Sequence, residues 1–168
     1  METKQMIRIS VRNLVEFILR SGDIDNRHVM SGDQAMSEGS RIHRKLQSGR
    51  GSNYRAEVAL KFQKDCKDYD LSIEGRADGI IIEEDVTIDE IKGIYMNLEA
   101  LSEPIPVHLA QAKCYAYIYG IQNDLERIRV QMTYSNLDTN DMKYFTNCKT
   151  LEELRKEYKT LLLSPKLP

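Results

Sequence analysis

Two carboxylates and a lysine stand among apolar residues in the stretch 75–93, GRADGIIIEEDVTIDEIKG. If residues 83–85 form the turn of a hairpin, Asp78 lies directly opposite Glu90 on one face, and Lys92 points the same way. Side chains opposed in this way have Cβ atoms about 5 Å apart, and two like charges there destabilise the sheet. A divalent cation between the carboxylates reverses the sign of that interaction. The spacing therefore indicates a metal site with a lysine beside it.

The same face of the predicted hairpin carries apolar residues, with Ile80 paired to Ile88 and Ile82 paired to Val86. A solvated strand face is the alternative, because acids and lysine are ordinary there. The apolar neighbours argue against it. A two-residue turn would place the two carboxylates on opposite faces, so the metal site depends on the register. Asp89 is expected to face water.

Periodicity and end signals predict the elements that would position these residues. In chain order they are helices over 10–22 and 34–48, strands over 54–62, 69–82 and 86–95, a helix over 107–122, a strand over 127–134 and a helix over 150–163. Ser10 is the expected cap of the first helix and Gly22 its end. Consecutive strands between helices indicate an α/β or α+β sandwich, a central mixed β-sheet flanked by helices, in a single domain over 1–168.

Composition limits the environment and the partners. The 168 residues are 41% hydrophobic and carry a net charge of -2, so a nucleic-acid partner requires a local basic patch. No stretch approaches the length of a membrane span, and no secretory signal is evident. The three cysteines lack metal-ligand spacing. A cytoplasmic protein with reduced thiols and no membrane association is expected.

The acids and lysine, together with two further motifs, resemble the PD-(D/E)XK nuclease superfamily, and in particular its RecB-like branch. The motif "EGSRIH" places His43 on a helix before the strands, and "QAKCYAY" places Gln111 and Tyr115 on the helix after them. The signature residues between these motifs are Asp78, Glu90, Ile91 and Lys92. Glu57 matches a position that is commonly acidic in the branch. The resemblance is closest to the nuclease-like domain at the front of some bacterial DNA helicases of the DinG/XPD type, and it implies an α/β fold with a restriction-endonuclease-like core.

The resemblance implies a role for each of these residues. The implied catalytic residues are Asp78, Glu90 and Lys92, and the implied metal ligands are His43, Asp78, Glu90 and the main-chain carbonyl of Ile91. The implied cofactor is Mg²⁺ or Mn²⁺. Lys92 would orient the attacking water and stabilise charge on the phosphate. Glu57 is expected to support the site rather than to bind metal. Several relatives hold an iron–sulfur cluster on four cysteines, whereas this chain has three in other places, so no cluster is expected.

Two groups of residues are candidates for binding the substrate. Gln111 and Tyr115 are four residues apart and share a helix face, although core packing is the alternative for the tyrosine. The stretch 41–55 contains no acid, and its basic residues could follow a DNA backbone; the substrate-binding candidates among them are Arg41, Arg44 and Lys45. A solvated helix face is the alternative for this stretch. His108, three residues before Gln111, is expected to be solvated.

Together these observations predict a metal-dependent deoxyribonuclease, an exonuclease acting on single-stranded DNA or DNA ends in repair or recombination. The chain lacks a P-loop sequence, so a helicase partner would supply any ATPase activity. One alternative is a catalytically weak DNA-binding module that acts with a helicase. Another is an interaction domain whose acids are only solvated surface.

Overall fold

The computed structural model describes residues 4–19 and 32–162, without the side chains of 32–37 and 161–162. Its strands are β1 (Gln5–Ser10), β2 (Tyr54–Asp65), β3 (Tyr69–Ile81), β4 (Thr87–Ile94), β5 (Arg127–Asn136) and β6 (Met142–Thr150). Its helices are α1 (Val11–Leu19), α2 (Gly32–Ser48), α3 (Pro106–Gln122) and α4 (Leu151–Leu162), with a short 3₁₀ helix η1 (Leu98–Ala100).

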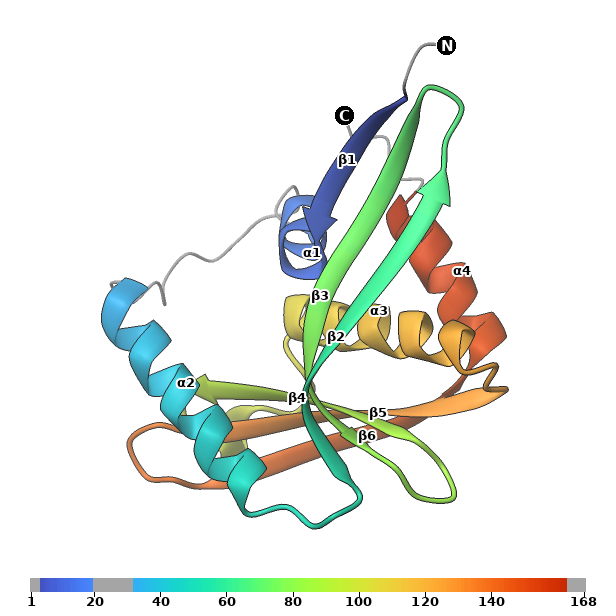
Figure 1. The fold of residues 1–168 in the computed structure, drawn as a ribbon. Coiled ribbons are helices and arrows are strands. Elements are labelled where there is room, and N and C mark those ends of the chain that lie inside the picture. Colours follow the sequence, from blue (N-terminus) through green and yellow to red (C-terminus); the bar gives the residue numbers. More distant parts are fainter. Residues whose placement is uncertain (1–3, 20–31, 163–168) are drawn as a thin grey trace.

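All six strands belong to one mixed sheet in the order β1-β3-β4-β5-β6, with β2 paired to β3 outside this path (Figure 1). The β1–β3 and β4–β5 pairs are parallel and the others are antiparallel. Helix α3 carries the chain from β4 to β5, because two parallel neighbours need a crossover connection. The predicted central mixed sheet with flanking helices is confirmed.

The helices divide between the two faces of the sheet. Helices α1 and α4 both contact α3, and with it they cover the main apolar core, which includes Ile88 of β4 and Met132 of β5. Helix α2 lies apart from them along β4 (Figure 1). Because side chains alternate along β4, Ile88, Glu90 and Lys92 face α3, whereas Asp89 and Ile91 face the other way. The strand is therefore covered from both sides where the candidate residues lie.

The capping contacts agree with the predicted starts of the first and last helices. The Ser10 hydroxyl accepts a hydrogen bond from the Asn13 amide at 3.0 Å, and the Thr150 hydroxyl accepts one from the Glu153 amide at 3.2 Å. The expected end of the first helix at Gly22 lies outside the described residues. Strands β1 and β6 were not predicted from the sequence. No helix in the described part of the chain is long and apolar enough to cross a membrane.

The register of the β3–β4 hairpin is the predicted one. Ile80 pairs with Ile88, flanked by the pairs Gly79–Asp89 and Ile81–Thr87. The predicted Ile82–Val86 pair does not form, since the strands end one residue earlier on each side and the loop is longer. Ile80 and Ile88 keep the predicted pairing, but the predicted pair Asp78–Glu90 does not form, because the ladder ends at Gly79–Asp89.

Candidate functional site

The site lies where β3 and β4 separate. Their ladder ends at the pair Gly79–Asp89, and beyond it β3 turns away from β4 (Figure 1). Asp78 is the first residue of β3 inside this fork, and its Oδ2 atom accepts a hydrogen bond from the Ile91 amide at 2.8 Å. The carboxylate thus replaces the strand contact that the fork removes. Burial raises the pKa of Asp78, while the charge of His43 and the Ile91 amide oppose the rise.

A local distortion aims Asp78 into the fork. Core-facing residues of β3 are odd-numbered at Ile73 and Ala77 but even-numbered at Ile80. The change falls beside Glu57 of β2, whose φ of 54° is left-handed. Glu57 and Asp78 do not pair, although the register is the same on both sides of them. A left-handed backbone costs a residue other than glycine about 1–2 kcal/mol, and such strain is concentrated at functional sites.

His43 reaches the fork from α2. Its Nε2 atom lies 2.8 Å from the carbonyl oxygen of Ile91, and its Nδ1 atom lies 3.4 Å from Oδ1 of Asp78. One imidazole therefore contacts two of the oxygen-bearing groups that the resemblance assigns to a metal. Since the Ile91 carbonyl can only accept, Nε2 is the nitrogen that donates in this arrangement.

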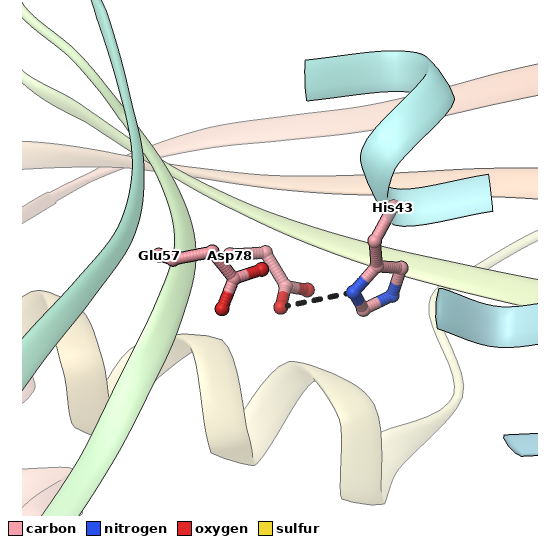
Figure 2. A group of neighbouring side chains, drawn as sticks. All are labelled: His43, Glu57 and Asp78. Carbon is pink, nitrogen blue, oxygen red and sulfur yellow. Dashed lines mark ion pairs between the residues drawn. The ribbon is translucent and has the colours of Figure 1, made fainter. Parts of the chain in front are cut away.

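Three of the candidate groups form a cluster with the donor types of a metal site. Figure 2 shows His43, Glu57 and Asp78 turned toward one another from α2, β2 and β3. One ligand atom from each lies within 4.8 Å of the others. Glu57, which was expected only to support the site, thus has a carboxylate oxygen within 4.8 Å of the ligand atoms of His43 and Asp78. The sequence signal for it was the acidic position in "YRAEVAL".

Glu90 and Lys92 approach from the α3 side of β4. Glu90 is 2% exposed, and its Oε1 atom lies 2.9 Å from Nζ of Lys92. Its Oε2 atom is buried and has no hydrogen-bond partner among the described residues. Burial raises the pKa of Glu90 to about 8; Lys92 opposes this rise and Asp78 adds to it. A buried carboxylate oxygen without a partner is costly, so the site fits a bound cation. The alternative of a solvated strand face does not fit these buried acids.

Gln111 of α3 contacts Lys92, and Tyr115 contacts Gln111. Oε1 of Gln111 accepts a hydrogen bond from Nζ of Lys92 at 3.2 Å, and its Nε2 atom donates to the Tyr115 hydroxyl at 3.5 Å. Both side chains are buried, and Tyr115 packs closely against Gly75 of β3. The structure brings Gln111 to Lys92 and Tyr115 to Gln111, as the shared helix face indicated. Their contacts are those of residues that position the lysine.

Asp89 does not face water, so that prediction is wrong. Its carboxylate is fully buried on the α2 side of β4 and accepts four side-chain hydrogen bonds. The donors are Gln131 at 3.2 Å, Thr133 at 2.5 Å, Tyr54 at 3.1 Å and Arg50 at 3.4 Å. The chain satisfies a buried acid with several donors, and these lie on the α2–β2 connection, β2 and β5. Asp89 is a structural acid, in contrast to Glu90 beside it.

Asp89→Ala is expected to lower the free energy of unfolding by about 3 kcal/mol, because it leaves buried hydroxyl donors without their acceptor. Urea unfolding followed by circular dichroism measures the change. Asp85→Ala is the control, since Asp85 pairs with Arg127 and Arg129 near the surface and should cost less than about 1 kcal/mol. Equal losses in the two variants would contradict the structural role of Asp89.

The predicted basic residues lie on the same helix as His43. Arg41, Arg44 and Lys45 have exposed side chains, and Arg44 donates a hydrogen bond to the Ser40 carbonyl of its own helix. Arg50 differs, because it binds Asp89. Arg41, Arg44 and Lys45 therefore form an exposed basic surface on the helix that carries His43.

His108 is not solvated as expected. Its ring is partly buried, and its Nδ1 atom lies 3.2 Å from the Tyr134 hydroxyl, which accepts a hydrogen bond from the Ile105 amide. Burial lowers the pKa of His108 to about 3, and the nearby charges of Lys92 and Arg12 add to the effect. The ring is therefore neutral at physiological pH and shares a hydrogen bond with the Tyr134 hydroxyl.

Comparisons with known proteins show the fold. The crystal structure of SSO0001 matches with a TM-score of 0.63 at 18% identity, over 99% of this chain and 81% of that one. An alkaline exonuclease, LHK-Exo from Laribacter hongkongensis, matches with a TM-score of 0.50 at 15% identity, over 92% and 86%. Neither a protein-family model nor a curated protein sequence matches. The likeness confirms the predicted restriction-endonuclease-like fold, which this chain shares with an exonuclease.

Proposed function

We propose that the protein is a divalent-metal-dependent nuclease that hydrolyses DNA phosphodiester bonds as an exonuclease in repair or recombination. The observation that carries the proposal is the fork itself, where two buried carboxylates, Asp78 and Glu90, meet His43 from one side and Lys92 from the other. The unpartnered oxygen of Glu90 fits a cation. The fold shared with an alkaline exonuclease supports this reaction class.

The chain's own residues divide the work. Those that would hold the cation are His43, Asp78, Glu90 and the Ile91 carbonyl, with Glu57 as an added ligand. Carboxylates, a carbonyl and one imidazole suit Mg²⁺ or Mn²⁺. A bound cation supplies positive charge for the phosphate and the attacking water. Lys92 orients that water and stabilises negative charge on the phosphate, and Gln111 keeps its ammonium in place.

The substrate and partners are part of the same proposal. DNA ends or single strands lie across the exposed basic surface of α2, formed by Arg41, Arg44 and Lys45, which neutralise backbone phosphates. The chain 1–168 acts as one cytoplasmic nuclease domain, and a helicase of the DinG/XPD type is its partner. The resemblance in sequence motifs supports this pairing.

Removing the metal or one ligand is expected to stop cleavage of end-labelled DNA. EDTA should abolish the products, and added Mg²⁺ or Mn²⁺ should restore them. Asp78→Asn should lower the rate by about a hundredfold or more, since even the outer partners of metal ligands contribute 10–100-fold. The asparagine oxygen can still accept the Ile91 amide, so the fork keeps its shape.

Cleavage that persists in EDTA or in Asp78→Asn would contradict the proposal. DNA binding by the wild type without cleavage in Mn²⁺ would favour the alternative, a catalytically weak binding module. The product ladder gives the polarity of an exonuclease.

A further inference from the structure

Helix α2 places a second side chain in the fork, one turn after His43 and on the same face. The Nε2 atom of Gln47 lies 2.8 Å from Oε1 of Glu57 and 2.8 Å from the main-chain oxygen of Asp78. A carbonyl and an ionised carboxylate only accept hydrogen bonds, so the amide nitrogen of Gln47 must be the atom that faces them. One nitrogen therefore joins the two acidic residues of the cluster.

The Asp78 carbonyl is open to Gln47 because the β2–β3 ladder is interrupted there. Glu57 is left-handed and does not pair with Asp78, although the residues on either side of the two do pair. The side chain of Gln47 replaces the missing strand contact and holds the Glu57 carboxylate with the same atom.

A second polar contact of Glu57 is weak by comparison. Its Oε2 atom lies 3.9 Å from Arg76, and the two side chains are 43% and 66% exposed. Exposed pairs at this distance hold a carboxylate loosely. The short hydrogen bond from Gln47 is thus the contact that fixes where Glu57 points.

We propose that Gln47 is a positioning residue that holds the Glu57 carboxylate beside Asp78 and so sets the affinity of the site for a divalent cation. The inference rests on the proposed function, because it needs the metal site, but it assigns a role that the nuclease motifs do not contain. Outer partners of metal ligands typically change metal affinity by 10–100-fold.

Mn²⁺ binding measured by calorimetry tests the role without DNA. Gln47→Met keeps the length of the side chain but removes the donor, and it should weaken Mn²⁺ binding by about tenfold or more. Ser48→Ala is the matched control, since the Ser48 hydroxyl donates to the Lys45 carbonyl of its own helix, and its affinity should be unchanged. Thermal unfolding in EDTA checks that each variant folds. If Gln47→Met does not fold, Gln47→Asn replaces it. The shorter asparagine side chain cannot reach both acceptors, so this variant should show the same weakening of Mn²⁺ binding.

A double-mutant cycle tests whether Gln47 acts through Glu57. In a Glu57→Gln background, Gln47→Met should change Mn²⁺ affinity by less than about twofold, because the carboxylate that it positions is gone. Unchanged affinity in Gln47→Met alone, or an equal loss in both backgrounds, would overturn the role.

Cleavage is scored separately, so the two proposals can fail independently. If Gln47→Met weakens Mn²⁺ binding while the wild type cuts no DNA, the nuclease function falls and the positioning role stands. If Gln47→Met binds Mn²⁺ as the wild type does and the wild type cuts DNA, the positioning role falls and the nuclease function stands.

Discussion

Glu90→Gln is expected to make the metal-free protein more stable while it abolishes Mn²⁺ binding and DNA cleavage. Glu90 is 2% exposed, Lys92 contacts only its Oε1 atom, and burial raises its pKa to about 8. Holding that carboxylate ionised in a buried place lowers the stability of the fold. Glutamine keeps the shape without the charge, so the gain in stability and the loss of function come from the same atom.

The dependence on pH follows from the direction of the pKa shift. The pKa of Glu90 in the folded protein lies above its ordinary value of 4.5, so the folded state binds the proton more tightly than the unfolded chain does. The stability from this proton is complete below the ordinary pKa and is lost as the pH rises through about 8. The advantage of Glu90→Gln should therefore be large above that pH and small well below it.

The expected size is a net gain of about 2 kcal/mol near pH 9, because several kcal/mol of charge burial are offset by about 1–3 kcal/mol for the unmet hydrogen bonds of the new amide. The unfolding temperature of Glu90→Gln in EDTA should then lie about 5 °C above that of the wild type. In the wild type, Mn²⁺ should raise the unfolding temperature, and in Glu90→Gln that rise should disappear.

Glu74→Gln is the control for this prediction. Glu74 is partly exposed, and its pKa is lowered by the hydrogen bond from the Ser72 hydroxyl and by the nearby charge of Lys61. Removing the charge of Glu74 should therefore not stabilise the protein at alkaline pH. A loss of stability in Glu90→Gln at every pH, with Mn²⁺ binding intact, would mean that Glu90 is a structural acid like Asp89.

The register of the β3–β4 hairpin could be predicted from the sequence, because the alternation of side chains along a strand is a local property. The pairing of Ile80 with Ile88 buries both, and this frame places Glu90 on the same face of β4 as Ile88. Asp78 lies beyond the last pair of the ladder, beside the left-handed Glu57. The faces of Gln111 and Lys92 followed in the same way, from helix and strand periods.

Asp89 and Glu57 could not be placed from local patterns. Alternation puts Asp89 on the face opposite Glu90, but whether that face meets water depends on the α2–β2 connection and on Thr133, far along the chain. The position of the Glu57 side chain depends on the left-handed backbone of Glu57 itself. The sequence gives no sign of this conformation, because the residue is neither glycine nor asparagine. Strands β1 and β6 were missed because much of their surface is exposed, which leaves little apolar alternation to detect.

Lys92→Met is expected to separate metal binding from catalysis. The ammonium lies 2.9 Å from Glu90 and 3.2 Å from Gln111, and it is the cation that the buried Glu90 has in the metal-free protein. Methionine keeps the apolar stem and removes the charge. Mn²⁺ binding should survive, and no competing cation remains at Glu90, whereas cleavage should fall by about a hundredfold or more because charge on the phosphate is no longer stabilised.

The same substitution should leave a signature in stability that Glu90→Gln does not show. Without Lys92, the ionised Glu90 loses its counter-ion, so metal-free Lys92→Met should be less stable than the wild type above about pH 8, where Glu90 is ionised, and close to it well below that pH. Mn²⁺ should recover much of the loss, because the cation then neutralises Glu90. Lys113→Met is the matched control. Lys113 lies on α3 and pairs with Glu157 at 3.2 Å, and its side chain is 25% exposed against 23% for Lys92. Full cleavage by Lys92→Met, or the same pH-dependent loss in Lys113→Met, would show that the lysine in the fork has no special part in the reaction.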